Sequence, residues 1–138
     1  GGQGERRLLR MVARHADAWN VPFVGVQRFR HLNDVLTSWC DTEERDPATV
    51  LRTVNLGLAL AANEAGLPVL ESQLRSQFGP ALKVLRHGML VGTPAQVIER
   101  IGEYRDAGAD WVILAMRAPF DLDGLARFVS DVMPAFAD

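Results

Sequence analysis

The chain has 138 residues, of which 48% are hydrophobic and 23% charged, a balance typical of one ordered globular domain. Its formal net charge of −2 excludes the strongly basic surface of a nucleic-acid-binding domain. Its single cysteine excludes an intrachain disulfide and a cysteine-based zinc site, and no apolar run reaches the roughly 20 residues that cross a membrane.

Helical and strand patterns alternate along the first half of the chain. Apolar residues at helical spacing predict helices over 5–15 and 27–40, and a short apolar run closed by Pro22 predicts a strand over 18–21. A charged turn follows. Residues 52–60 then alternate between large apolar and small side chains, which indicates a strand buried on both faces.

The second half begins with two predicted helices, over 68–78 and 81–87, and Gly88 is expected to be the left-handed cap of the second. The sequence Thr93-Pro94-Ala95-Gln96 has the pattern of a capping box, which predicts a helix from there to Gly108. The apolar run 110–116 predicts a third strand. Three strands among at least four helices favour an α/β fold with a parallel sheet.

A last helix is expected to begin at Asp121 or Asp123, either of which can act as its N-cap. Helical spacing predicts that its buried side consists of Leu125, Phe128, Val129, Val132 and Phe136.

The glycine-rich start of the chain is the first candidate site. Gly1, Gly2 and Gly4 would let backbone N–H groups approach a ligand, and the helix start adds partial positive charge, a combination typical of phosphate sites. Glu5 would oppose a phosphate, and Arg6 or Arg7 could offset it. A glycine-rich end without a binding role is the alternative.

Three further residues are weaker candidates. Asn20 and Arg117 follow or end predicted strands, and the carboxyl ends of parallel strands carry the sites of α/β folds. Thr93 begins a helix whose N-terminus could face an anion, although a plain N-cap is the favoured interpretation.

The histidines and tryptophans are expected to have structural rather than catalytic or metal-binding roles. His31 and His87 are predicted on helices without acidic or cysteine partners, and no metal-ligand spacing of His or Cys occurs, so no metal site is expected. The histidines are His15, His31 and His87. The tryptophans stand at apolar periodic positions and are expected in the core; they are Trp19, Trp39 and Trp111.

Two motifs resemble those of the luciferase-like monooxygenases, particularly their deazaflavin-dependent (coenzyme F420) oxidoreductase class. The segment GGQGERRLLRMVARHADAWN is similar to the family's Gly-Gly-x-Gly-Glu-[Arg/Lys]-Arg and Ala-Asp-x-Trp-Asn stretch after its fifth strand. The segment LVGTPAQV at 90–97 resembles Val-Gly-Thr-Pro-Glu-Gln-Val, with Ala95 in place of the usual Glu. Segments 104–110 and 134–136 also fit, so the resemblance spans essentially the whole chain.

The resemblance implies a (β/α)8 TIM barrel. The three predicted strands would be strands six, seven and eight, and the helices over 68–87 would be an insertion. Residues 1–138 would then be the C-terminal portion of one barrel domain, because a complete barrel needs about 250 residues. The start at Gly1 rather than Met fits a glycine loop separated from its strand.

The resemblance also implies a cofactor. Backbone amides of Gly1 and Gly2 would contact the phosphate of coenzyme F420, with FMN as the alternative, and Gly4 would allow the close approach. The family's chemistry is hydride transfer at the cofactor ring, to or from a small organic substrate, and the resemblance implies a cytoplasmic enzyme that can form a homodimer. No residue here is assigned a catalytic role, and this chain alone is expected to be inactive.

Two other functions stay open. The first is an FMN-dependent monooxygenase of the same fold. The second is a non-catalytic half-barrel that binds a phosphate ligand or assembles with a partner half, because three strands leave open edges and apolar helix faces to cover. Neither nucleic acid nor membrane is expected as a partner.

Overall fold

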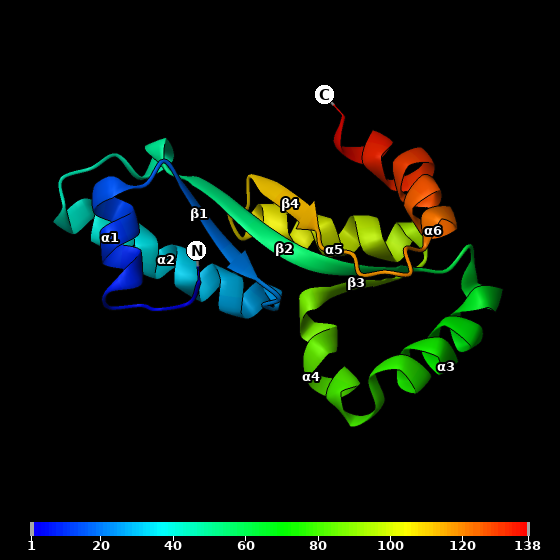
Figure 1. Cartoon of the computed structure of the whole chain (residues 1–138). Coiled ribbons are helices and arrows are strands. Elements are labelled where there is room, and N and C mark those ends of the chain that lie inside the picture. Colours follow the sequence, from blue (N-terminus) through cyan, green and yellow to red (C-terminus); the bar gives the residue numbers. More distant parts are fainter. Residues whose placement is uncertain (1, 138) are drawn as a thin grey trace.

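The computed structural model describes residues 2–137 and shows an α/β fold of strands alternating with helices (Figure 1). The strands are β1 (Ala18–Pro22), β2 (Leu51–Leu60), β3 (Met89–Gly92) and β4 (Trp111–Leu114). The helices are α1 (Leu8–His15), α2 (Val26–Thr42), α3 (Leu67–Phe78), α4 (Leu82–Leu85), α5 (Pro94–Asp106) and α6 (Leu122–Arg127).

All strand pairs in the sheet are parallel, which confirms the prediction. Strand β2 is central: β1 pairs with its residues 51–55, β4 with 53–56 and β3 with 57–60. Residues 53–55 pair with β1 and β4 at once, so these two strands lie on opposite edges of β2 (Figure 1). The first half of β2 is therefore the middle strand of a three-stranded parallel sheet.

Strand β3 is a fourth strand that the sequence did not predict. It has four residues and is followed at once by the capping motif of α5, so it is too short to show an alternating pattern. Its identity as a strand comes from its pairing with β2, which lies about 30 residues earlier in the chain.

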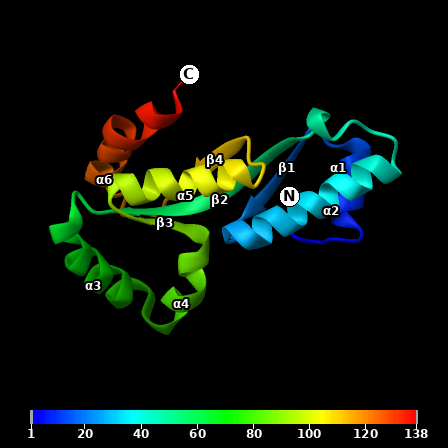
Figure 2. The same cartoon turned by 180° about the vertical axis from the view of Figure 1, so that it is seen from behind.

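One face of the sheet packs on α2 and α5, which lie in front of the strands when the molecule is viewed from behind (Figure 2). Val54 and Leu56 of β2 are fully buried there. The ring of Trp19 stacks on Phe29 of α2 at 5.6 Å, and Phe29 meets Tyr104 of α5 edge-on at 6.0 Å. This aromatic row joins β1 to both covering helices and confirms the core position of Trp19.

The opposite face of the sheet is largely open. Trp111 and Ile113 of β4 point to this face and are 62% and 40% exposed. Helices α3 and α4 cover only its far end, where Leu74 and Leu82 pack on Ala59. The core position predicted for Trp111 is therefore wrong, because its strand is buried by helices on one face only, whereas Trp39 is half-buried against the core.

Several helix ends differ from the sequence predictions. Helix α1 begins at Leu8 rather than Glu5, after a turn over residues 5–7. Gly88 is not a left-handed cap, because its φ is not among the positive values of residues 2–137. Gly79 and Gly108, with φ of 51° and 92°, do end α3 and α5 at the predicted positions.

The last helix begins at Asp121, whose carboxylate accepts a hydrogen bond from the Gly124 N–H at 2.8 Å. Beyond α6 the chain continues as a π-helical turn over 128–132 and a 3-10 turn over 133–136. These turns change the helical period, so Val132 is fully buried whereas Val129 and Phe136 are 53% and 36% exposed. The predicted buried side is wrong for these last two residues.

Tyr104 gives the core a spectroscopic reporter, because it is the chain's single tyrosine. Its hydroxyl donates to the Val24 carbonyl at 2.6 Å, and burial raises the pKa of the phenol to about 12. A raised pKa means that the fold favours the neutral phenol. This contribution to stability is complete below pH about 10 and is lost as the pH rises through about 12.

Titration of the folded chain, followed by phenolate absorbance, is expected to show a midpoint near pH 12. The chain in concentrated urea is the control, and its midpoint is expected at about 10. Equal midpoints in the two states would contradict the buried hydrogen bond.

Among residues 2–137, no helix has both the length and the apolar character to cross a membrane.

Candidate functional site

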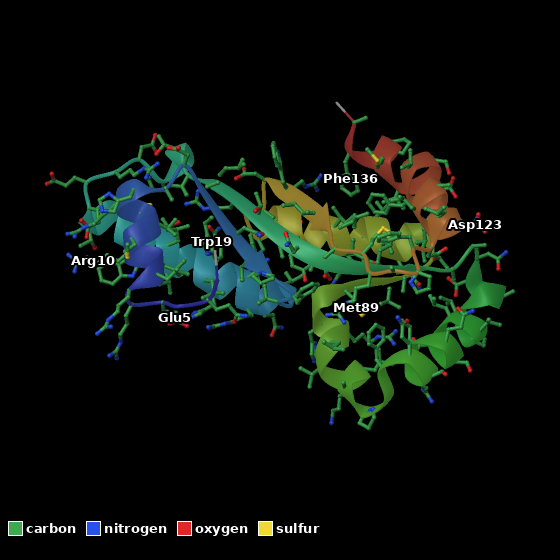
Figure 3. The ribbon with its side chains drawn as sticks, in the orientation of Figure 1. Glu5, Arg10, Trp19, Met89, Asp123 and Phe136 are labelled. Atoms are coloured by element: carbon green, nitrogen blue, oxygen red, sulfur yellow. The ribbon has the colours of Figure 1, made fainter. Side chains whose placement is uncertain are left out.

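Residues 2–7, called the glycine loop from here on, lie between β1 and α2 and lead into α1. The Gly2 N–H donates to the Asn20 carbonyl of β1 at 2.9 Å, and the Leu9 N–H donates to the Gly4 carbonyl at 3.0 Å. Figure 3 shows Glu5 of the loop and Trp19 of β1 at the same end of the molecule. The loop is thus attached to the edge of the sheet. Gly1 lies outside the described residues.

The two described glycines of the loop pack against the first residue of α1. Gly2 has a φ of 125°, a conformation that residues with a side chain rarely adopt, and a Cβ there would lie 3.4 Å from Leu8 Cδ2. A Cβ at Gly4 would lie 3.1 Å from Leu8 Cβ. Glycine is therefore needed at residue 2 for its backbone angle and at residue 4 for its close contact.

The carboxylate of Glu5 is bound by α2. Arg28 Nη1 lies 2.7 Å and His31 Nε2 3.2 Å from Glu5 Oε1. The hydrogen bond from Arg28 is the largest cause that lowers the pKa of Glu5; burial opposes it, and the hydrogen bond and charge of His31 lower the pKa further. The charge of Glu5 is therefore balanced from α2, whereas the sequence suggested Arg6 or Arg7.

His31 thus has an acidic partner, which corrects the sequence analysis. Arg28 Nε also donates to Gln3 Oε1 at 3.4 Å, so one guanidinium joins two residues of the glycine loop. Arg28 and His31 are one helical turn apart, which places both on one side of α2. This one-turn spacing of Arg28 and His31 is the signal that the sequence offers for a shared partner. It does not identify that partner as Glu5, which lies 23 residues before Arg28.

The backbone N–H groups of the loop fall into two sets. The Gly2 N–H, which the resemblance assigns to a phosphate, donates to Asn20 of β1. Within residues 2–137, the other N–H groups of the loop, those of Gln3, Gly4, Glu5, Arg6 and Arg7, have no acceptor in hydrogen-bonding geometry. A short segment with several unpaired N–H groups, next to a helix start, is the arrangement that binds oxyanions in proteins.

Polar side chains of β1 and β2 lie together on the open face of the sheet. Thr53 Oγ1 donates to Asn20 Oδ1 at 3.1 Å, because the register pairs these two residues directly. Asn55, two residues further along β2, has a buried Oδ1 with no donor within residues 2–137. Sequence reasoning missed Thr53 and Asn55, although both are polar and stand at the small-residue positions of β2.

The other sequence candidates lie apart from the glycine loop. Thr93 caps α5: its hydroxyl accepts from the Gln96 N–H, and Gln96 Oε1 accepts from the Thr93 N–H at 3.0 Å, which completes the predicted capping box. Arg117 is exposed beyond β4. Since β2 lies between β1 and β4, the structure does not bring Arg117 to Asn20.

Solved structures of similar fold include a reductase and two monooxygenases. The coenzyme F420-dependent tetrahydromethanopterin reductase of Methanopyrus kandleri has a TM-score of 0.75 and 15% identity, over 99% of this chain and 50% of that chain. The EDTA monooxygenase of Chelativorans sp. BNC1 has a TM-score of 0.75 and 17% identity, over 96% of this chain and 44% of that chain.

A third structure is the FMN complex of a type II Baeyer–Villiger monooxygenase, the oxygenating constituent of 3,6-diketocamphane monooxygenase from Pseudomonas putida. It has a TM-score of 0.69 and 14% identity, over 98% of this chain and 47% of that chain. This chain therefore spans at most about half the length of these three proteins. No family model and no curated protein matches the sequence.

Proposed function

We propose that this chain, whose fold is that of the luciferase-like monooxygenases, forms the C-terminal part of a (β/α)8 barrel. Strands β1, β2 and β4 would be its sixth, seventh and eighth strands. Three observations support this: the strands are parallel, helices cover one face of them, and the other face exposes Trp111 and Ile113. In a barrel that second face lines the packed interior.

The proposed activity is that of an oxidoreductase that uses coenzyme F420 and a small organic substrate. The observation that carries it is the glycine loop, whose N–H groups without an acceptor among residues 2–137 suit a phosphate. Gly2 and Gly4 let the loop backbone pack closely on Leu8, and the resemblance implies that Gly1 and Gly2 contact the phosphate and that Gly4 allows the close approach. A cytoplasmic location and a homodimer stay predictions of the resemblance.

The residues present fit the phosphate of such a cofactor. Its ring would supply hydride exchange with the substrate. Within this chain, N–H groups of the loop would donate to the phosphate oxygens, and Arg28 would keep the Glu5 carboxylate turned toward α2. Thr53 and Asn55 would contribute polar groups to the barrel interior, where Asn55 Oδ1, which has no donor among residues 2–137, could accept a hydrogen bond.

The proposal is tested by titrating the protein, as its gene encodes it, with coenzyme F420 and with FMN at matched concentrations. Tight binding of F420 is expected. The variant Gly2→Ala is expected to weaken it about tenfold or more, because a side chain is strained at a φ of 125° and the loop must shift. Gly102→Ala is the matched control, since a Cβ there meets no atom within 4 Å.

The same titration decides between the alternatives. An FMN-dependent monooxygenase is the second candidate, favoured by the match to the FMN complex over 98% of this chain. Preference for FMN, with a flavin absorbance band in the purified protein, would establish it over the F420 proposal. Binding of neither cofactor would overturn both and leave the non-catalytic half-barrel.

A further inference from the structure

The glycine loop is held by two indole N–H groups that come from different elements. Trp19 Nε1, on β1, donates to the Gly2 carbonyl at 3.0 Å. Trp39 Nε1, on α2, donates to the Glu5 carbonyl at 2.8 Å. These two residues are 17 and 34 positions from their acceptors, so the bonds exist only in the folded chain. They fix the loop near both of its ends.

Both indoles are themselves held in place. Trp19 is fully buried and stacks on Phe29 at 5.6 Å. Trp39 is half-buried against the core, and the guanidinium of Arg10 lies 5.2 Å from its ring centre. A donor on a ring that is packed against its neighbours holds its acceptor at a defined place, because less side-chain freedom is left to lose.

Because the peptide bond is planar, these two contacts also fix the direction of the backbone N–H group that follows each carbonyl. In a planar trans peptide, the C=O and the following N–H point in opposite directions. Since the Gly2 carbonyl points at Trp19, the Gln3 N–H points away from Trp19. Since the Glu5 carbonyl points at Trp39, the Arg6 N–H points away from Trp39. These are two of the loop's unpaired N–H groups.

A third peptide of the loop is fixed in the same way. The Gly4 carbonyl accepts from the Leu9 N–H at 3.0 Å, which orients the Glu5 N–H away from α1. Three carbonyls of the loop thus accept hydrogen bonds from the protein, which fixes the direction of the N–H that follows each; these N–H groups, like those of Gly4 and Arg7, have no acceptor among residues 2–137.

We propose that Trp19 and Trp39 are positioning residues of the phosphate site: their indole N–H groups fix the loop peptides so that the Gln3 and Arg6 N–H groups face the ligand. This inference rests on the proposed function, because it needs the loop to bind a phosphate group. It assigns the tryptophans a role through the backbone, without contact to the cofactor.

The test uses Trp39, because its ring is only half-buried and its replacement leaves the core in place. In one variant Trp39→Phe removes the N–H together with part of the ring. In a second, benzothienylalanine replaces Trp39, which keeps the ring size and exchanges the N–H for sulfur. Trp111→Phe is the control, since Trp111 is 62% exposed and its indole has no acceptor among residues 2–137.

Two measurements distinguish an effect on the order of the glycine loop from an effect on ligand binding. Without ligand, backbone 15N relaxation of Gln3 and Arg6 is expected to give order parameters of about 0.85 in the native chain and below about 0.6 in both Trp39 variants. With inorganic phosphate, the same two amide signals are expected to shift in the native chain. The dissociation constant for phosphate is expected to rise about tenfold in both variants and to stay unchanged in the control.

The outcomes distinguish the two proposals. If the native chain shows no phosphate shifts at the loop and the gene-encoded protein binds neither cofactor, the proposed function fails and this inference with it. If the native chain binds phosphate but the benzothienylalanine variant binds it equally well, or keeps an ordered loop, the inference alone is overturned. Urea unfolding of each variant verifies that it is folded under the binding conditions.

Discussion

Replacing Arg52 with methionine is expected to lower the free energy of unfolding by about 3 kcal/mol, because it removes the donors of several buried acceptors at once. Arg52 is only 8% exposed. Its Nη1 donates to the Pro47 and Val50 carbonyls at 2.7 and 2.6 Å, and its Nε donates to Asn33 Oδ1 of α2. Methionine keeps the apolar stem of the side chain, so the lower free energy of unfolding results from the lost hydrogen bonds and not from a new cavity.

Urea unfolding, followed by tryptophan fluorescence, measures this loss. Arg30→Met is the matched control, because Arg30 is exposed on the same helix that Arg52 contacts and has no ion pair within residues 2–137. It is expected to change stability by no more than about 0.5 kcal/mol. Arg52→Lys is expected to recover part of the loss, since an ammonium cannot reproduce the geometry of the guanidinium. Equal midpoints for Arg52→Met and Arg30→Met would refute the role of Arg52.

Arg52 also shows what the sequence leaves undetermined. Its position in a strand with alternating small residues predicts burial, and the parallel sheet follows from such patterns. Its acceptors, by contrast, lie on a helix 19 residues earlier and on the turn before the strand. No local pattern pairs them. Local signals therefore predict most of the elements, as the capping box of Thr93 and Gln96 confirms, but they miss the short strand β3 and the contacts between elements.

The candidate site shows the same difference between local patterns, which the sequence reveals, and contacts between elements, which it does not. The glycine-rich motif is local, and the sequence identifies it as a candidate. The side chains that shape the loop, Trp19, Arg28 and Trp39, come from β1 and α2, and their roles appear only when these elements pack together. Trp39 illustrates the limit: helical periodicity predicts its burial, and this is partly confirmed, but the donor on its ring has no signature in the sequence.

Gly88→Ala is the second large effect expected, and it reverses the sequence interpretation of that glycine. A left-handed cap would require glycine for its φ angle, whereas the structure requires it for space. A Cβ at Gly88 would lie 2.5 Å from both the Cα and the carbonyl carbon of Phe23. Since backbone cannot move aside as a side chain can, we expect a loss of about 3 kcal/mol in the free energy of unfolding, measured by urea unfolding.

Tyr104 provides an independent measure of the same substitution. Its hydroxyl lies 2.6 Å from the Val24 carbonyl and 3.4 Å from the His87 carbonyl, so it bridges the two segments that meet where Gly88 touches Phe23. Pushing them apart would admit water to the phenol, and the pKa of Tyr104 is expected to fall from about 12 toward 10. Gly102→Ala, in the middle of α5 with no atom within 4 Å of its Cβ, is expected to leave the titration unchanged and to stabilise the helix by about 0.5–1 kcal/mol. If both variants behaved alike, the close contact at Gly88 would not be what requires glycine there.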